Sequence, residues 1–311
     1  MAQISYRVLI LGYGEMGHAM VHLLRGRHEI RVWQRRPSAE TATVDIDQST
    51  SDSDFVIFCL PAQPLHELAR RIAPRLSPET LCLTIAKGLD DNGRTPAEAL
   101  AAGLNGAPFA VLYGPMISEE IRAGRPAFAQ CGVRSPYTFE RIHGLFRGTT
   151  LHLDQTTDIT GLSWSAILKN VYAMGFGMAD ELGFGDNVRG FLAVVALREL
   201  DGIVTQLGGQ AATAYNLAGL GDLITTATST GSHHHELGRL IARGVRDELK
   251  GEGVHTLSIL RTAGRCNLSS FPLFNLIDNC LRNPDSTRAQ LNAFLEQSRV
   301  NTSVNFGVRQ E

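Results

Sequence analysis

Val8-Leu9-Ile10-Leu11-Gly12-Tyr13-Gly14-Glu15-Met16-Gly17 combines an apolar, strand-like run with the pattern G-x-G-x-x-G, and a helical pattern follows it at residues 18–24. At such a turn Gly12 permits the tight bend, Gly14 lets a pyrophosphate approach the backbone, and Gly17 lets the helix pack close to the strand. The alternative is a glycine-rich turn without a ligand, but the strand–turn–helix context favours phosphate binding at the positive end of the helix. The cofactor site expected from this motif comprises Gly12, Gly14, Glu15, Met16 and Gly17.

Six further apolar runs follow the glycine motif, at residues 29–33, 54–60, 80–85, 109–113, 127–131 and 150–153. Helical patterns, such as residues 63–72, lie between them. Runs that are apolar without alternation are typical of strands buried on both faces of a parallel sheet. Repeated βα units that open with a dinucleotide-binding turn predict an α/β fold with a Rossmann-type doubly wound sheet.

The second half of the chain changes character. From Thr160 to Leu207 it is mostly apolar and helical, interrupted mainly by a glycine-rich bend at residues 182–186. No repeat or flexible linker separates the halves, so we expect a direct passage from strand to helix near Asp158. This predicts an NAD(P)-binding domain at residues 1–157 and an all-helical C-terminal domain at residues 158–311, with a cleft beside the boundary.

The composition bounds the class of protein. Of 311 residues, 43% are hydrophobic and 19% charged, which is typical of a globular protein with a sizeable core. A net charge of −2 gives no bulk attraction to nucleic acid or to an anionic membrane. We find no signal-peptide pattern and no apolar run long enough to span a bilayer. The five cysteines form no C-x-x-C pair, so buried thiols in a reducing, cytoplasmic compartment are the simplest interpretation.

The residues after the second strand-like run bear on cofactor preference. About twenty residues beyond the glycine motif, an NAD-specific site usually offers Asp or Glu to the ribose hydroxyls. This chain has Arg35 and Arg36 there instead. Two guanidinium groups without an acid suit a 2′-phosphate, so NADP is favoured over NAD; the alternative is a pair of solvated turn arginines.

Three charged side chains are candidates for chemistry. Lys87 follows a central strand directly, at the sheet edge where ligands of open α/β sheets bind, although a surface lysine is the alternative. Lys169 interrupts an apolar helical run, so it either extends to solvent or lies in a cleft where burial lowers its pKa toward the range useful for proton transfer. Asp222 lies on a glycine-flanked bend, where a helix cap is the simpler interpretation.

Six short motifs occur in one order along the chain: residues 12–17, Ala86-Lys87-Gly88, Gly114-Pro115, Leu168-Lys169-Asn170, residues 183–187 and residues 218–223. Together they resemble the NAD(P)-dependent glycerol-3-phosphate dehydrogenase family over nearly the whole chain. The resemblance implies a Rossmann domain followed by an all-helical domain, in a homodimer. It also implies hydride transfer between nicotinamide C4 and the carbonyl carbon of dihydroxyacetone phosphate, which interconverts this ketone and sn-glycerol 3-phosphate.

The resemblance implies roles for single residues as well. Lys169 matches the family's proton donor and acceptor, Lys87 a lysine that contacts substrate and cofactor, and Asp222 a carboxylate that orients the lysine. The physics agrees, since hydride arrival at a carbonyl builds negative charge on oxygen, which an ammonium group stabilises. Ser118 and Glu252 are expected at the cofactor. The substrate site is expected to comprise Lys87, Gly114, Asn170, Asp222, Ser232, His233 and His234.

Two departures from the family pattern concern the substrate phosphate. The family typically carries Ser-Arg-Asn, whose Arg and Asn hold the phosphate, where this chain has Ser232-His233-His234 followed by His235. A hydroxyl-bearing Ser or Thr of the family corresponds to Met116. Arginine is always charged, whereas histidine is only fractionally charged at neutral pH. One hypothesis is a retuned histidine anion pocket, with phosphate affinity rising as the pH falls through the histidine range. The other is a different, unphosphorylated substrate.

We expect no metal site, because three consecutive histidines cannot all face one ion from a helix or strand. The sequence thus predicts a homodimeric dehydrogenase of the glycerol-3-phosphate type that uses NADP, or alternatively NAD. One rival is a reductase of the same two-domain superfamily acting on another small hydroxy or oxo compound, which Met116 and the histidines motivate. The other rival is a regulator that binds the cofactor without turnover. The joint presence of Lys87, Lys169 and Asp222 argues against it.

Overall fold

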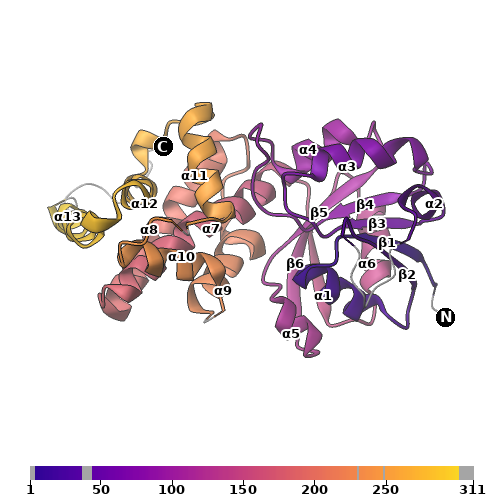
Figure 1. Cartoon of the computed structure of the whole chain (residues 1–311), viewed down its shortest axis with the longest axis horizontal. Coiled ribbons are helices and arrows are strands. Elements are labelled where there is room, and N and C mark those ends of the chain that lie inside the picture. The colour runs from indigo at the N-terminus through magenta and orange to yellow at the C-terminus, as the bar shows by residue number, and fades with distance from the viewer. Residues whose placement is uncertain (1–3, 37–43, 230, 248, 301–311) are drawn as a thin grey trace, which may run out of the picture.

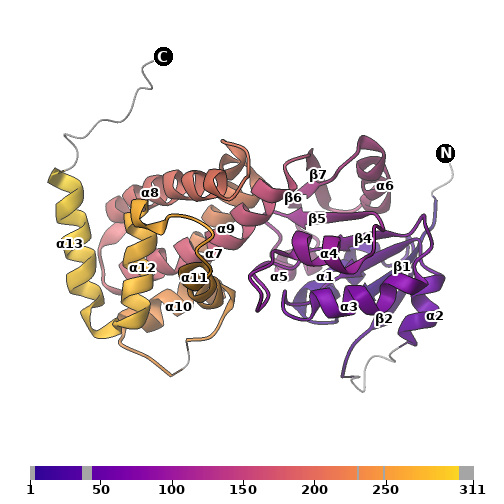
Figure 2. The ribbon, with the colours of Figure 1, turned by 90° about the horizontal axis from the view of Figure 1, so that it is seen from above.

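The computed structural model describes residues 4–36, 44–229, 231–247 and 249–300, so residues 301–311 of the expected C-terminal domain lie outside it. The N-terminal part is a seven-stranded sheet with helices on both faces, and the C-terminal part is helical. The two parts lie side by side along the longest axis of the molecule (Figure 1). Seen from above, α13 (Thr287–Val300) forms the end of the molecule farthest from the sheet (Figure 2).

The seven expected strand-like runs all form strands: β1 (Arg7–Leu11), β2 (Glu29–Trp33), β3 (Phe55–Phe58), β4 (Leu81–Thr84), β5 (Phe109–Tyr113), β6 (Ala127–Gly132) and β7 (Leu151–Thr156). Their spatial order is β2-β1-β3-β4-β5-β6-β7. Because β2 pairs with one edge of β1 and β3 with the other, the strand order reverses at β1. Open α/β sheets bind ligands at such a point, beyond the carboxyl ends of the strands.

The sheet is not parallel throughout, which differs from the expectation. The strands β1 to β5 are parallel, but β6 runs antiparallel to β5, and β7 is then parallel to β6. The connection after β5 holds only the short helix α5 (Ser118–Arg122) and does not cross to the opposite edge of the sheet. Instead the Phe128 N–H donates to the Pro115 carbonyl, so the chain turns back beside β5.

Helices cover both faces of the sheet because its strands are apolar on both sides. One core joins the sheet to α1 (Glu15–Leu24), α5 and α6 (Pro136–Phe146). The other joins it to α2 (Ile46–Ser51), α3 (Leu65–Ile72), α4 (Pro96–Gly103) and the start of α7 (Ile159–Glu181). Since α7 contributes to a sheet core, the helical part is anchored directly on the sheet.

The helical part is built around α7, which is buried from Gly161 to Ala179. The helices α8 (Gly185–Gln206), α9 (Asp222–Thr228), α10 (His233–Ala242), α11 (Glu252–Ala263) and α12 (Pro272–Arg282) pack around it. Of the expected bend at residues 182–186, residues 182–184 separate α7 from α8, and residues 185 and 186 form the start of α8. Among the described residues, no helix combines the length and apolar character needed to cross a membrane.

Asp158 forms the passage from β7 to α7. Its buried carboxylate accepts the Gly161 N–H at 2.9 Å as a helix cap, the Gln210 N–H at 2.8 Å and the Thr213 hydroxyl at 2.7 Å. These bonds satisfy both carboxylate oxygens without a cation and tie the start of α7 to the segment after α8. The strand-to-helix passage near Asp158 is therefore direct and rigidly held.

A second buried carboxylate stabilises the helical part. Glu199 accepts the N–H groups of Leu273 and Phe274 in the first turn of α12 at 2.7 and 2.8 Å, and the Tyr172 hydroxyl at 3.1 Å. Burial raises the pKa of Glu199 to about 7. The three hydrogen bonds favour the ionised form and oppose this rise.

We expect Glu199→Ala to lower the free energy of unfolding by about 3 kcal/mol, because it leaves two buried N–H groups without an acceptor and opens a cavity. Urea denaturation measures this loss. The matched control is Glu181→Ala, which removes a half-buried carboxylate paired with the exposed Arg243 at 2.8 Å and is expected to cost about 1 kcal/mol or less. Equal losses in the two variants would contradict the assigned role of Glu199.

Candidate active site

Two adjacent cavities lie where the sheet meets the helical part. The first, the glycine-loop cavity, measures about 320 Å³ and is lined by Gly14, Glu15, Met16, Cys59, Leu60, Pro61, Ile85, Ala86, Lys87, Met116 and Glu252. The second, the lysine cavity, measures about 230 Å³ and is lined by Lys87, Met116, Ile117, Glu119, Lys169, Asp222, Thr225, Thr226, Ser229, Gly231, Ser232 and His234. Lys87 and Met116 border both cavities, so molecules bound in the two would meet at these side chains.

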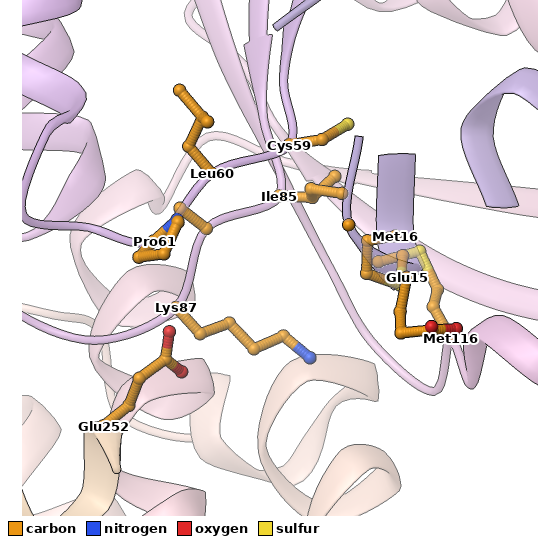
Figure 3. Close-up of a pocket in the computed structure, with 11 residues that line it drawn as sticks. Glu15, Met16, Cys59, Leu60, Pro61, Ile85, Lys87, Met116 and Glu252 are labelled. Carbon is orange, nitrogen blue, oxygen red and sulfur yellow. The ribbon is translucent and has the colours of Figure 1, made fainter. Parts of the chain in front are cut away.

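Figure 3 shows the glycine-loop cavity. Glu15, Met16 and Met116 lie on one side, and Lys87 and Glu252 lie across from them (Figure 3). Glu252 is the first residue of α11, so the helical part supplies one wall of a cavity that otherwise belongs to the sheet.

The three glycines of the loop have the geometry that a dinucleotide requires. Gly12 has φ +100°, and a Cβ there would lie 2.4 Å from the Cys59 carbonyl oxygen. A Cβ on Gly17 would lie 2.3 Å from the Gly12 carbonyl oxygen, so only glycine lets α1 begin this close to the turn. Gly14 is the N-cap residue of α1, and a Cβ added there would have no neighbouring atom within 4 Å. The backbone at Gly14 therefore leaves room for phosphates at the amino end of α1.

Several polar and charged side chains lie near the glycine loop. Glu15, in the first turn of α1, pairs with Arg122 at 3.2 Å. Ser118 is buried and donates to Glu119 at 2.9 Å, but it does not line either cavity. Arg35 and Arg36 are exposed and follow β2 after one intervening residue, Gln34. The carbonyl of Trp33, the last residue of β2, accepts the Gly12 N–H at 2.8 Å. Both arginines thus lie at the same sheet edge as the glycine loop.

Three charged groups from separate parts of the chain meet in the lysine cavity. Lys87 Nζ lies 2.6 Å from Asp222 Oδ2, and Lys169 Nζ lies 3.2 Å from Asp222 Oδ1. Lys169 also donates to Thr226 Oγ1 at 2.6 Å, and that hydroxyl donates to the Asp222 carbonyl at 2.7 Å. A π-helical turn, residues 217–221, precedes Asp222 at the start of α9. Such turns interrupt helices frequently at functional sites.

Burial and mutual charge shift the pKa values in this cluster. Burial lowers the pKa of Lys169 to about 8, with Asp222 opposing the shift and Lys87 adding to it. Burial alone would raise the pKa of Asp222, but the two lysines outweigh it and hold that pKa below its usual range. Burial raises the pKa of Glu252 to about 7, against the influence of both lysines. Lys169 therefore exchanges its proton near neutral pH while Asp222 stays ionised.

The three consecutive histidines turn in three directions. His233 is exposed, and its Nε2 lies 3.0 Å from the Lys250 carbonyl oxygen, outside the lysine cavity. His234 lines the cavity and its Nε2 accepts the Gly253 N–H at 3.3 Å. His235 is buried and pairs with Asp180 at 2.8 Å. Ser232 lines the cavity and caps α10 by accepting the His235 N–H.

His234 does not supply the positive charge that a histidine anion pocket needs. A ring nitrogen that accepts a backbone N–H carries no proton, so the imidazole is neutral. Burial and the neighbouring Lys169 lower the pKa of His234 to about 3. Titration of His234 through the ordinary histidine range is therefore not expected, and the structure argues against the first of the two phosphate hypotheses.

Two expected substrate residues lie behind the cavity rather than in its wall. Asn170 is buried on α7 and does not line either cavity; its Oδ1 has no partner among the described residues. At Gly114, with φ +156°, a Cβ would lie 2.5 Å from the Phe128 carbonyl oxygen, so this glycine permits the close return of β6. The structure brings together Lys87, Lys169, Asp222, Ser232 and His234, but not His233, Asn170 or Gly114.

The sequence interpretation missed Thr226 and Glu119. Thr226 lies four residues after Asp222, and on a helix this spacing places both side chains on one face. Glu119 adjoins Ser118 but carried no motif of its own. A further signal is the choice of cation: the chain has three lysines, Lys87, Lys169 and Lys250, among 29 lysines and arginines. Two of these three lysines contact Asp222. Of the two residue types, only lysine can release its proton near neutral pH, because arginine stays charged.

Two family models match the chain. Residues 37–136 match the family model described as NAD-dependent glycerol-3-phosphate dehydrogenase N-terminus, and residues 158–292 match its C-terminus counterpart. A glycerol-3-phosphate dehydrogenase [NAD(P)+] of Deinococcus radiodurans is 34% identical over 278 residues, 82% of each chain. One of Nitratidesulfovibrio vulgaris is 29% identical over 300 residues, 86% of this chain and 91% of its relative.

Solved structures share the fold. A glycerol-3-phosphate dehydrogenase from Coxiella burnetii superposes with a TM-score of 0.83 at 23% identity, over 94% of this chain and 99% of that one. A 2-dehydropantoate 2-reductase from Geobacter metallireducens superposes with a TM-score of 0.60 at 16% identity, over 89% of this chain and 99% of that one. The same two-part architecture therefore occurs in proteins named for different substrates.

Proposed function

The chain belongs to the NAD-dependent glycerol-3-phosphate dehydrogenase family, and we propose that its reaction takes place where the two cavities meet, at Lys87, Lys169 and Asp222. It is an NAD(P)-dependent oxidoreductase of the glycerol-3-phosphate dehydrogenase type, and the curated relatives are named for glycerol 3-phosphate. Oxidation of the secondary alcohol of that compound gives the corresponding ketone, dihydroxyacetone phosphate. The observation that carries the proposal is the buried Lys169, hydrogen-bonded to Thr226 and paired with Asp222, beside a cavity that adjoins the glycine loop.

Lys169 would move the proton of the reaction. In the reducing direction the carbonyl carbon gains the hydride that the bound nicotinamide supplies, while the carbonyl oxygen takes a proton from Lys169 Nζ. In the oxidising direction the neutral Lys169 removes the alcohol proton. A pKa of about 8 leaves both protonation states accessible near neutral pH, as general acid–base catalysis requires.

Asp222 and Lys87 would position this lysine and stabilise charge. Asp222 holds both ammonium groups in place and raises the pKa of Lys169 against the effect of burial. Lys87 borders both cavities, so its ammonium group can attract the oxygen on which negative charge develops. Thr226 fixes the direction of the Lys169 Nζ group through its hydroxyl oxygen.

The glycine-loop cavity would hold the cofactor. The open backbone at Gly14 and the amino end of α1 would bind the pyrophosphate, with Glu15 and Met16 beside it. Met116 and Glu252 would lie near the reactive end of the cofactor, since they line this cavity together with Lys87.

We further propose that NADP is preferred over NAD. The support is the pair of exposed arginines, Arg35 and Arg36, at the end of β2 beside the glycine loop. We expect the double variant Arg35→Ala/Arg36→Ala to raise KM for NADPH by about tenfold or more, because guanidinium–phosphate hydrogen bonds are lost, and to leave KM for NADH nearly unchanged. Steady-state kinetics with both cofactors measure this.

The control for this pair is Arg75→Ala. Arg75 is exposed and lies between α3 and β4, so it is near the amino ends of the strands. Arg35 and Arg36 lie at the carboxyl ends, on the opposite side of the sheet. Its loss tests whether any reduction in positive surface charge weakens NADPH binding. If the double variant changes KM for NADPH and NADH equally, the arginines do not recognise the 2′-phosphate.

The function is tested by following NADPH and NADH oxidation with dihydroxyacetone phosphate and a panel of small ketones, and the reverse reaction with the alcohols. Turnover that requires Lys169 supports the assignment. Cofactor binding, measured by NADPH fluorescence, without turnover of any compound would instead indicate a regulator.

We also infer a cytoplasmic homodimer. The exposed side chains of Phe191 and Val194 on one face of α8 support a second copy as partner, and all five cysteines are free, as in a reducing compartment. Light scattering on the purified protein tests the oligomeric state.

A further inference from the structure

The loop that follows β4, residues 85–95, carries Lys87 and packs against the helical part of the molecule; we call it the lysine loop. Its first three residues, Ile85, Ala86 and Lys87, line the glycine-loop cavity. Leu89 is buried and belongs to the hydrophobic core of the helical part rather than to a core of the sheet. The sheet therefore supplies this loop, but contacts with the helical part hold it.

Two glycines let the lysine loop lie close against α11. A Cβ on Gly88 would lie 3.3 Å from the side chain of Glu252, and a Cβ on Gly93 would lie 3.1 Å from Ile259 Cγ2. Both glycines have positive φ, +109° and +73°, which other residues rarely adopt. Glu252 and Ile259 are seven positions apart, so they lie on one face of α11. At the first contact, Glu252 and Lys87 lie next to each other in the cavity wall (Figure 3).

Arg265 follows α11 and joins the lysine loop to two helices. Its guanidinium group donates to the Gly93 carbonyl at 2.5 Å, pairs with Glu98 of α4 at 2.7 Å, and lies 5.1 Å from the ring centroid of the buried Trp164 of α7. Burial alone would raise the pKa of Glu98, but Arg265 and the Thr95 N–H hold that pKa below its usual range. The planar fork of arginine suits three such contacts better than an isolated surface ion pair.

The lysine loop is internally braced, so that a restraint at one point holds the whole of it. The buried carboxylate of Asp90 accepts the N–H groups of Asn92 and Arg94, each at 2.9 Å, and pairs with the Arg94 side chain at 2.7 Å. The Gly93 N–H in turn donates to the Asp90 carbonyl at 2.9 Å. Fixing Gly93 therefore also limits the movement of Lys87 at the start of the loop.

We propose that Arg265 is a positioning residue, which holds Lys87 and Glu252 in the wall of the glycine-loop cavity. Arg265 lines neither cavity, so it acts through the lysine loop and through α11. The inference rests on the proposed function, because Lys87 pairs at 2.6 Å with Asp222, the carboxylate that also holds Lys169. A displaced loop would weaken this cluster and the cofactor cavity together.

The first experiment removes the guanidinium group. We expect Arg265→Ala to raise Kd for NADPH and to lower kcat, each by about fivefold, since a displacement of about 1 Å at positioned groups can cost up to about a hundredfold in rate. Fluorescence titration measures Kd, and steady-state kinetics measure kcat. A loss of folded protein alone lowers the apparent kcat and leaves Kd unchanged, so the joint change separates positioning from stability.

Three further variants serve as controls. Arg261→Ala removes an exposed arginine of α11 that pairs with Asp278 at 3.2 Å inside the helical part, and we expect Kd and kcat within about twofold of the parent values. Arg265→Lys keeps the charge without the planar fork and should recover part of the loss. Glu98→Gln keeps an oxygen to accept the Thr95 N–H but loses the ion pair. Combined with Arg265→Ala, it should add no further loss.

Hydrogen exchange reports the lysine loop directly. We expect Arg265→Ala to speed exchange of the Asn92 and Arg94 amides about fivefold, and Arg261→Ala to leave it unchanged. Unchanged exchange, Kd and kcat in Arg265→Ala overturn the inference, and so do equal changes in Arg261→Ala. A parent protein that binds NADPH but turns over no ketone or alcohol overturns the proposed function instead, while Kd and exchange still decide whether Arg265 positions the loop.

Discussion

Replacing Lys169 by methionine is expected to lower kcat by about a thousandfold, the range in which general acid–base groups contribute. Methionine fills a similar volume, so α7 keeps its packing while the proton donor is lost. Lys169 lies 2.6 Å from Thr226 and 3.2 Å from Asp222, and burial lowers its pKa to about 8. Steady-state and single-turnover kinetics measure the loss.

The control is Lys250→Met, which replaces the one lysine outside the cluster. Lys250 is exposed and lines neither cavity, and its backbone carbonyl oxygen lies 3.0 Å from His233 Nε2. We expect its kcat to remain within about twofold of the parent value, as for surface substitutions away from a site. A Lys169→Met variant that retains more than about a tenth of the parent kcat would show that the proton comes from another group.

The same assignment sets the pH dependence of the parent enzyme. Reduction of the ketone requires protonated Lys169, so kcat in that direction should fall as the pH rises through about 8. Oxidation of the alcohol requires neutral Lys169, so kcat in that direction should rise over the same interval. Both limbs should vanish in Lys169→Met. Parallel pH profiles in the two directions would contradict the role of this lysine.

Replacing Asp222 by asparagine is expected to lower kcat by about a hundredfold and the free energy of unfolding by about 3 kcal/mol. The change leaves Lys87 and Lys169 close together without a counter-charge, and removing one partner of a buried pair is strongly destabilising. It also removes the carboxylate that raises the pKa of Lys169, so the fall of the reduction rate should begin at a lower pH than in the parent.

The control for Asp222→Asn is Asp278→Asn. Asp278 is also a buried carboxylate shared by two cations, since Arg261 and Arg282 lie 3.2 and 3.1 Å from it, but it lies on α12, away from both cavities. We expect Asp278→Asn to reduce stability, measured by urea denaturation, while kcat and its pH profile stay unchanged. If both variants shift the pH profile alike, Asp222 acts through stability alone.

Local patterns were sufficient for the elements of the sheet. The glycine motif and the seven strand-like runs formed as the sequence indicated, and the chain bends at residues 182–184, the first part of the expected bend. Each depends on residues within one turn or one strand, where periodicity and backbone geometry act directly. A Cβ on Gly17 would meet the Gly12 carbonyl within the same turn, so the spacing of these glycines was a dependable local signal for the fold.

The direction of β6 and the fate of the three histidines had no such local signal. A strand has the same apolar pattern whichever way it runs, so the antiparallel pairing of β6 depended on where α5 returned the chain. His233, His234 and His235 are equivalent as letters, but the rotation of α10 against α7 exposes one, turns one into the cavity and buries one against Asp180.

The candidate site shows the same division most clearly. Lys87 and Asp222 are separated by 135 residues, yet their side chains meet at 2.6 Å. Family motifs named these residues, but the charge balance of the lysine cavity, the neutrality of His234 and the presence of Glu119 in the wall came from packing. Sequence periodicity encodes which face of an element is buried. Proximity across a cleft depends on how the sheet and the helical part pack together, and that packing sets the charges and the pKa values in the lysine cavity.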